Sequence, residues 1–370
     1  MSKIINVKKE YDFYDDSMVV FDKLPAQVYI IRFAKMRGFY LEQYADIEIK
    51  EEKIYGVCEE KVAKVLNAFH RANRNLGVIL SGDKGIGKSL CAKLLAENAV
   101  KRNIPVIIVD KFYPNIAQYI ETIEQEVMVL FDEFDKTFAN IKTSENEAEP
   151  QAGLLSLFDG ISQGKKLFVI TCNQLNRLND FLINRPGRFH YHFRFEYPSE
   201  RETREYLQDK LSPEYWDEIE PVVAFSRKVN LNYDCLRAIA FELNAGDKFS
   251  DAIKDMNILN TEDYYYIVKL YFENGYVMTR KNTCLDLFDD ELSFNLKDAK
   301  GRNIVKAKFS GHDCKYDIYK HTNIVNAENL ELEYDTYFED EDDFEEIKQM
   351  KPAYMTITRI QSRGMHYDIR

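Results

Sequence analysis

The chain has 370 residues, 45% hydrophobic and 30% charged, and its 62 acidic residues outnumber its 50 basic residues to give a net charge of −12. These values are typical of a folded protein of two or three domains, and the acidic balance argues against a general nucleic-acid binder, whose affinity depends on neutralising phosphates. The sequence has no apolar run near the roughly 18 residues of a membrane span and no signal-peptide pattern. We therefore expect a cytoplasmic protein without a membrane partner.

The cysteines and histidines are dispersed along the chain. The six cysteines form no Cys-x-x-Cys pair, which favours reduced thiols over a disulfide framework or a zinc site. His190 and His192 alternate along a predicted strand, and this pattern alone does not indicate a metal site. The abundance of Lys, Asn, Ile and Tyr favours an AT-rich bacterial or phage genome.

The first 53 residues predict a small β-rich region. Val28–Phe33 and Phe39–Tyr44 are rich in β-branched and aromatic residues, and Met36-Arg37-Gly38 between them predicts the turn of a hairpin. A helix is then expected from Glu59 to about Ala72, because its apolar residues recur at i, i+3, i+4 and i+7.

From Leu76 onward the pattern changes to short apolar runs separated by helical segments. The predicted strands are Leu76–Leu80, Val106–Val109, Val127–Phe131 and Leu167–Thr171, and the helices between them include Leu90–Val100 and Leu154–Ile161. Apolar runs of this kind are typical of a parallel sheet buried on both faces. Residues 54–199 are therefore predicted to form an α/β core, with a polar loop at Ala139–Gln151.

The remainder of the chain predicts two further regions. Helical signals from Glu200 to about Leu243 indicate a small helical lid at residues 200–258. Residues 259–370 alternate polar and apolar side chains and contain Asn274-Gly275, a strong hairpin signal, so a β-rich C-terminal domain is expected. The acidic run Glu339–Glu346 is interpreted as a solvated loop, with a docking segment as the alternative.

One motif predicts a phosphate-binding loop. The pattern G-x-x-x-x-G-K-[ST] lies between a predicted strand and a predicted helix, where backbone N–H groups of the loop and of the helix N-terminus surround phosphate oxygens. Lys88 is expected to contact the β- and γ-phosphates of ATP, and the Ser89 hydroxyl to bind Mg²⁺. The predicted nucleotide-binding residues here are Gly82, Asp83, Lys84, Gly85, Ile86, Gly87, Lys88, Ser89 and Leu90.

Two acids follow the apolar run Val127–Phe131. Ligands of open α/β sheets bind at the carboxyl edge of the strands, which is where Asp132 and Glu133 are predicted to lie. Asp132 is expected to hold Mg²⁺. Glu133 is expected to orient or deprotonate the attacking water.

These motifs together resemble the AAA+ ATPases, specifically the AAA clade proper, from about Ile54 to Glu242. Val169–Asn173 is similar to that family's sensor strand, which implies that Asn173 holds the attacking water. Ile54-Tyr55-Gly56 is similar to the segment that lines the adenine. The resemblance implies an AAA+ core with a helical lid and hydrolysis of ATP with Mg²⁺.

The segment Leu182–Phe189, with sequence Leu-Ile-Asn-Arg-Pro-Gly-Arg-Phe, resembles the arginine-finger segment of the same family. The resemblance implies that Arg185 and Arg188 reach the ATP of a neighbouring subunit in a hexameric ring, where a guanidinium offsets charge on the transferring phosphoryl group. The chain departs from the family pattern at His190, where the family often has Asp. Arg237 follows too late to be assigned as the lid's second sensor.

The sequence is consistent with more than one use of the energy from ATP hydrolysis. Phe112 and Tyr113 follow the second predicted strand, and could either grip a polypeptide in a central pore or pack within a short loop. Three interpretations stay open: a protein remodeller, a nucleic-acid-handling ATPase such as a helicase loader or translocase, and a nucleotide-switched assembly module. The net charge favours a protein client over a nucleic acid.

Overall fold

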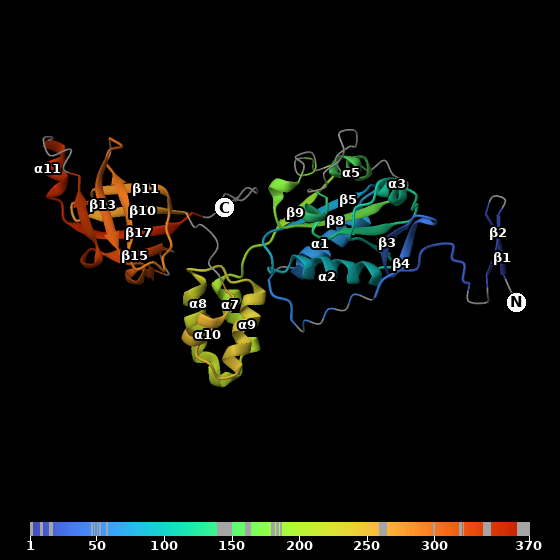
Figure 1. Cartoon of the computed structure of the whole chain (residues 1–370), viewed down its shortest axis with the longest axis horizontal. Helices are drawn as coiled ribbons and strands as arrows, with labels where there is room; N and C mark the ends of the chain where they lie inside the picture. The colour runs from blue at the N-terminus through green and yellow to red at the C-terminus, as the bar shows by residue number, and fades with distance from the viewer. Residues whose placement is uncertain are drawn as a thin grey trace. The chain divides into compact units, whose positions relative to one another are not determined.

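The computed structural model describes residues 3–7, 10–14, 18–45, 47, 49, 51, 53–56, 58–138, 150–159, 164–178, 182, 185, 187–258, 265–298, 300–317, 320, 322–335 and 342–360. The chain divides into two compact units (Figure 1). The N-terminal unit comprises Met1–Ser226 and Asn230–Met256, and the C-terminal unit comprises Arg227–Val229 and Asn257–Arg370. Among the described residues, no helix combines the length and apolarity required to cross a membrane.

A seven-stranded sheet forms the centre of the N-terminal unit, in the order β4-β3-β6-β7-β8-β5-β9. Its strands are β3 (Val28–Ala34), β4 (Gly38–Gln43), β5 (Leu76–Ser81), β6 (Val106–Val109), β7 (Val127–Phe131), β8 (Lys166–Cys172) and β9 (Tyr191–Arg194). Every neighbouring pair is parallel except β3 and β4. Each residue of β5, β7 and β8 is buried, which confirms the parallel sheet predicted from their apolar runs.

Helices cover both faces of this sheet (Figure 1). They are α1 (Cys58–Arg71), α2 (Lys88–Lys101), α3 (Ile116–Glu121), α4 (Phe134–Thr137) and α5 (Pro150–Phe158), with a short turn η1 (Leu175–Arg177) after β8. One hydrophobic cluster joins α1 and α2 to one face, and another joins α3, α4 and α5 to the other. The predicted α/β layered core is thereby confirmed. The polar stretch from residue 139 to 149 lies outside the described residues.

The predicted N-terminal hairpin flanks the core by joining its sheet. β3 pairs with β4 on one side and runs parallel to β6 on the other, with Val28 opposite Val106. The first four residues of β3 are all buried, and an isolated hairpin could not bury both of its faces. A separate two-stranded sheet precedes it, made of β1 (Lys3–Val7) and β2 (Glu10–Tyr14).

The helical region after the core contains α7 (Glu200–Lys210), η2 (Pro213–Glu218), α8 (Ile219–Ser226), α9 (Tyr233–Asn244) and α10 (Phe249–Asp255). Two of these helices begin at side-chain caps. Ser199 and Glu202 form a capping box at α7, and the Asn232 side chain accepts a hydrogen bond from the Cys235 N–H at α9. These caps fix where the predicted helical lid begins and how α9 enters it.

The C-terminal unit is built from two antiparallel sheets, in the orders β11-β10-β17-β15-β14 and β12-β13-β16. The strands are β10 (Tyr265–Phe272), β11 (Val277–Cys284), β12 (Leu292–Lys297), β13 (Asn303–Phe309), β14 (Lys315–Asp317), β15 (Thr322–Asn326), β16 (Glu331–Tyr334) and β17 (Pro352–Arg359), with short turns η3 (Gly311–Asp313) and η4 (Ala327–Asn329). One hydrophobic core joins both sheets, and the additional β-rich region predicted from residue alternation is confirmed.

Part of the acidic run in this unit is a helix. Residues 339–341 lie outside the described residues, and α11 (Asp342–Lys348) begins immediately after them. Phe344 and Ile347, three residues apart, are buried in the core of the unit, whereas Glu345 and Glu346 are exposed. The interpretation as a solvated loop was therefore wrong for this part, because Phe344 of the run and Ile347 just after it lie on one helical face.

Candidate nucleotide site

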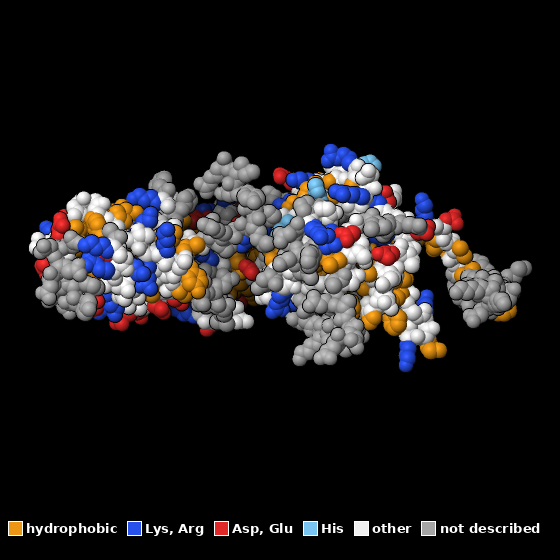
Figure 2. Space-filling view, turned by 90° about the horizontal axis from the view of Figure 1, so that it is seen from above, with side chains coloured by type: hydrophobic (Ala, Val, Ile, Leu, Met, Phe, Trp, Pro, Cys, Tyr) orange, Lys and Arg blue, Asp and Glu red, His pale blue; other side chains and the backbone are white. Residues whose placement is uncertain are grey.

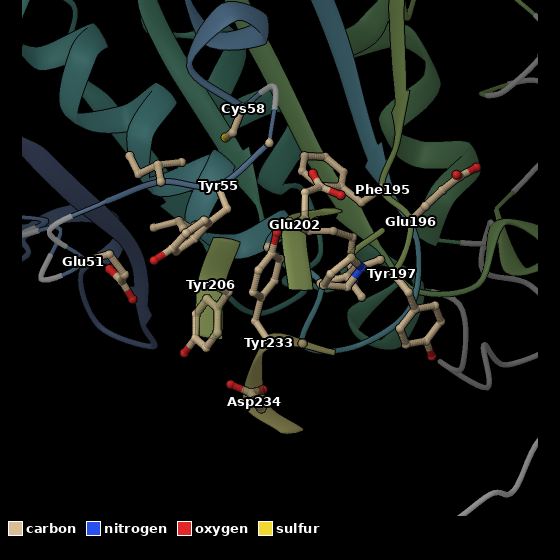
Figure 3. A pocket seen from close by; sticks show the side chains of 18 of the residues that line it. Glu51, Tyr55, Cys58, Phe195, Glu196, Tyr197, Glu202, Tyr206, Tyr233 and Asp234 are labelled. Atoms are coloured by element: carbon tan, nitrogen blue, oxygen red, sulfur yellow. The ribbon is translucent and has the colours of Figure 1, made fainter. Parts of the chain in front are cut away.

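A cavity of about 1080 Å³ lies within the N-terminal unit. Its walls come from the segment before α1, from the loop after β5, from the residues after β9, from α7, and from the first turns of α9 (Figure 3). The segments after β5 and β9 leave the carboxyl edge of the sheet, where α/β proteins bind their ligands. Gly85, Ile86, Gly87, Lys88, Ser89 and Leu90 all line this cavity, together with Tyr55 and Gly56.

Glycines in the predicted phosphate loop allow the backbone to turn tightly beside its neighbours. Gly82 and Gly85 have φ angles of 140° and 74°, in the region that residues with a Cβ rarely adopt. A Cβ on Gly82 would lie 2.5 Å from the Phe195 carbonyl oxygen, and one on Gly85 would lie 2.8 Å from the Asn232 side chain. The loop then enters α2 at Lys88, so the helix N-terminus points at the space that the loop surrounds.

Lys88 is the buried cation of this loop. Its side chain is only 6% exposed, and its ammonium group donates a hydrogen bond to the Asp83 carbonyl oxygen. Burial lowers the pKa of Lys88, because desolvation disfavours the charged form. An anion brought beside this ammonium group would stabilise its charge, so the loop is suited to phosphate.

The two acids after β7 share one hydroxyl group. The Thr171 hydroxyl donates a hydrogen bond of 2.6 Å to Asp132 Oδ1 and accepts one of 2.8 Å from the Glu133 N–H. The Glu133 carboxylate forms an ion pair with Lys136, which lowers the pKa of Glu133. Sequence reasoning assigned no role to Thr171, although its place two residues before Asn173 on the neighbouring strand was a usable signal.

Buried polar atoms without protein partners lie just beyond β7 and β8. Among the described residues, Asn173 Nδ2 and Asp135 Oδ1 are buried and have no hydrogen-bond partner. The other Asp135 oxygen accepts a hydrogen bond of 3.0 Å from the Gln174 N–H. Buried amide donors without a partner cost free energy, so a ligand or water oxygen at Asn173 would satisfy this site.

A metal ion at this site would require ligands from the nucleotide as well as from the protein. Among the described residues, no group of three or more His, Cys, Asp or Glu side chains is placed to hold a metal. Mg²⁺ is usually held by one or two protein oxygens together with phosphate oxygens and waters. Ser89 at the start of α2 and Asp132 after β7 fit this limited donor set.

Three tyrosines line another part of the cavity (Figure 3). The centroid of the Tyr55 ring lies 5.1 Å from that of Tyr206 and 6.1 Å from that of Tyr233. The Tyr55 hydroxyl donates a 3.0 Å hydrogen bond to Asp209. Burial raises the pKa of Tyr233. Tyr206 and Tyr233 come from α7 and α9, and sequence reasoning did not include them. Such an aromatic wall is suited to a flat base.

The beginning of α9 is attached directly to the phosphate loop. The Tyr233 N–H donates a 3.0 Å hydrogen bond to the Gly85 carbonyl oxygen, and Asn232 Nδ2 donates one of 3.3 Å to the Lys84 carbonyl oxygen. Arg237, which the sequence pattern left unassigned, also lines the cavity from α9. A movement of α9 would therefore also displace the phosphate loop.

The two predicted finger arginines differ in their surroundings. Arg188 is 7% exposed, and its guanidinium group donates two hydrogen bonds to Asp159, one of 2.7 Å between Nη2 and Oδ2. This pair lowers the pKa of Asp159. Arg185 is exposed, and so is His190. Neither arginine is among the described residues that line the cavity, and Arg188 is committed to a partner within its own subunit.

Phe112 and Tyr113 pack within the unit. Their loop joins β6 to α3, and the Phe112 ring lies 5.9 Å from Phe138. The Tyr113 ring lies 6.0 Å from Phe33 and 6.1 Å from Phe39, on the N-terminal hairpin. Both side chains are half-buried, so of the two interpretations left open, packing describes this conformation better than a free pore loop.

Comparison with known proteins agrees with this geometry. Residues 78–197 match the family model described as ATPase family associated with various cellular activities (AAA). The chain is 29% identical over 143 residues to a "Cell division cycle protein 48 homolog" of Archaeoglobus fulgidus. The aligned region covers 36% of this chain and 20% of that protein.

Two further relatives have similar coverage. An "AAA ATPase forming ring-shaped complexes" of Corynebacterium kroppenstedtii is 32% identical over 166 residues, covering 36% of this chain and 28% of that protein. An "Outer mitochondrial transmembrane helix translocase" of Danio rerio is 31% identical over 147 residues, covering 36% and 40% respectively. The chain thus spans less than half the length of these relatives. Residues 78–197 are therefore an AAA+ ATPase domain of the AAA family.

Proposed function

We propose that this chain hydrolyses ATP with Mg²⁺ at the cavity beside the phosphate loop. The observation that carries the proposal is the buried Lys88 at the start of α2, beside the carboxyl edge that bears Asp132 and Glu133. Positioning and electrostatic stabilisation supply most of the catalysis in phosphoryl transfer, and these residues provide both.

Each residue has a defined role in this proposal. Backbone N–H groups of Gly85–Ser89 and the Lys88 ammonium group would hold the phosphates, and Ser89 and Asp132 would hold Mg²⁺. Bound Mg²⁺ neutralises phosphate oxygens. Glu133 would orient the attacking water and accept its proton, and the unpartnered Asn173 amide would hold the same water. Tyr55 and Gly56 would line the adenine.

We further propose a homo-oligomeric ring, hexameric in stoichiometry and located in the cytoplasm. The printed name of the Corynebacterium relative refers to ring-shaped complexes. Arg185 is exposed, which supports a role at a neighbouring subunit, whereas Arg188 would have to leave Asp159 to take such a role. In this arrangement Arg185 acts on the neighbour's ATP, and Arg188 braces the segment that carries it.

A protein is the proposed client. Several large apolar side chains are exposed before and within the N-terminal hairpin, namely Val19, Val20, Phe21, Phe33 and Met36. Exposed apolar groups of this kind favour protein contacts. Lys and Arg side chains share the described surface shown in Figure 2 with Asp and Glu side chains, and the chain carries a net charge of −12. Together these features disfavour a general nucleic-acid client.

The proposal is tested by steady-state ATPase assays of wild type, Glu133→Gln and Arg185→Ala, with particle mass measured in ATP. We expect wild type to turn over as an oligomer, Glu133→Gln to bind ATP without turnover, and Arg185→Ala to assemble with strongly reduced turnover. Normal turnover by monomeric Arg185→Ala would leave only a generic P-loop ATPase.

The client class is tested in the same assay with unfolded protein and with single-stranded DNA. Stimulation by unfolded protein supports the remodeller. Stimulation by DNA that weakens with salt would instead favour a nucleic-acid-handling ATPase. Assembly in ATP with negligible turnover would favour a nucleotide-switched assembly module.

A further inference from the structure

The Thr171 hydroxyl lies between the two acids to which catalysis is assigned above. It donates to Asp132 Oδ1 at 2.6 Å and accepts from the Glu133 N–H at 2.8 Å. The directions are unambiguous, because an N–H can only donate and an ionised carboxylate can only accept. Thr171 is 1% exposed, so water is poorly placed to substitute for its hydroxyl group.

The backbone at Glu133 is held in an unusual conformation. Its φ and ψ angles are 47° and 48°, in the left-handed region that costs a residue other than glycine about 1 kcal/mol or more. Such conformations persist only where surrounding contacts hold them. The hydrogen bond from the Glu133 N–H to Thr171 is a contact of this kind, and it lies two residues beyond the end of β7.

The same hydroxyl group also restrains the orientation of the Asp132 carboxylate. Because Oδ1 is engaged by Thr171, the carboxylate is restrained in rotation and its other oxygen is left for a cation. One side chain on β8 therefore restrains both the proposed metal ligand and the proposed base on β7. The two strands are parallel neighbours, with Phe131 opposite Ile170, so this restraint is built into the rigid centre of the sheet.

We propose that Thr171 is a positioning residue that sets the metal-binding orientation of Asp132 and the water-directing orientation of Glu133 as one unit. This inference rests on the proposed function for the roles of the two acids. It goes beyond that function by assigning the coupling between them to a single hydroxyl group.

The test compares Thr171→Val, Thr171→Ala and Thr171→Ser with wild type. Valine has nearly the shape of threonine but leaves the Glu133 N–H and Asp132 Oδ1 without their partner, and serine retains the hydroxyl group. Thr203→Val is a matched control, because Thr203 is also 1% exposed and its hydroxyl has no hydrogen-bond partner.

Two quantities are measured besides thermal stability. One is the affinity of Mn²⁺ for the protein bound to ADP or to a non-hydrolysable ATP analogue, from the electron paramagnetic resonance signal of free Mn²⁺. The other is kcat and KM for Mg–ATP. Residues that orient metal ligands typically contribute 10- to 100-fold to metal affinity or activity. We expect losses of about this size in Mn²⁺ affinity and kcat for the Val and Ala variants, with KM for ATP changed little.

Thr171→Ser is expected to remain within a few-fold of wild type, and Thr203→Val to match it. If the Val and Ala variants bind Mn²⁺ and turn over like wild type, or lose only thermal stability, the inference is overturned while the proposed function stands. If wild type binds the Mn²⁺–nucleotide but does not hydrolyse ATP, the proposed hydrolysis fails. The Mn²⁺ comparison still decides the role of Thr171, and should Thr171→Val not fold, Thr171→Ala carries the comparison.

Discussion

The phosphate loop and the arginine segment of the same domain were both predicted from short motifs, yet they depend on different kinds of structure. The loop is shaped by its own glycines and by the strand and helix that adjoin it. The arginine segment depends on Asp159, which lies nearly thirty residues earlier in the chain and binds Arg188. A motif with local geometry is thus predictable in detail, whereas a side chain with a distant partner is predictable only in position.

The largest expected effect tests the loop side of this comparison. Glu133→Gln removes the proposed base while preserving side-chain size, so kcat should fall by about 10² to 10⁴-fold with ATP affinity retained. Glu97→Gln, which removes a partly exposed ion pair with Lys101, is the control, and its kcat should stay within two-fold of wild type. Turnover of Glu133→Gln near the wild-type rate would remove Glu133 from catalysis.

The next prediction compares how much Arg188 and Arg185 each contribute to the stability of the folded protein. Arg188→Ala breaks two charge-assisted hydrogen bonds of a buried guanidinium group and should lower the free energy of unfolding by about 1–3 kcal/mol. Arg185→Ala, at an exposed position, should change it by less than about 0.5 kcal/mol. Urea denaturation of both variants measures the difference. Equal stabilities would show that the pair with Asp159 does not hold the segment.

A smaller effect follows from pH. Arg188 lowers the pKa of Asp159 in the folded state, so the folded protein favours the ionised form. The stabilisation is therefore present above the ordinary Asp pKa of about 3.9 and is lost as pH falls through the lower folded value. The difference in unfolding free energy between wild type and Asp159→Asn should be largest near neutral pH and should decrease below about pH 4. A difference that is constant with pH would contradict the ion pair.

The smallest effect concerns the junction between α9 and the loop. Asn232→Ala removes the α9 cap and the hydrogen bond to Lys84, so stability should fall by about 1 kcal/mol. ATP affinity, measured by isothermal titration calorimetry, should weaken by a few-fold because the loop loses a restraint. Ser310→Ala, which removes a side-chain cap in the C-terminal unit, is the control and should leave ATP affinity unchanged.

Much of the N-terminal unit was predictable because its signals are local. Apolar runs of four or five residues identified the buried strands, and an apolar stripe at helical spacing identified α1. The hairpin was predicted as a pair of strands, but its place beside β6 was not. Pairing between distant strands depends on which strand edges of the sheet remain unpaired as it forms. The sequence of neither strand indicates which edge that is.

The sequence by itself determined the phosphate loop, the two acids after β7, the strands that carry them and the AAA character of the domain, because glycine placement, strand hydrophobicity and motif spacing act over a few residues. Tertiary structure alone decided that Thr171 joins Asp132 to Glu133, that Asp159 binds Arg188, and that Tyr206 and Tyr233 complete the cavity beside Tyr55. These contacts join residues brought together only by packing, and their short-range hydrogen bonds and ring contacts form only when the sheet and the helices are in place.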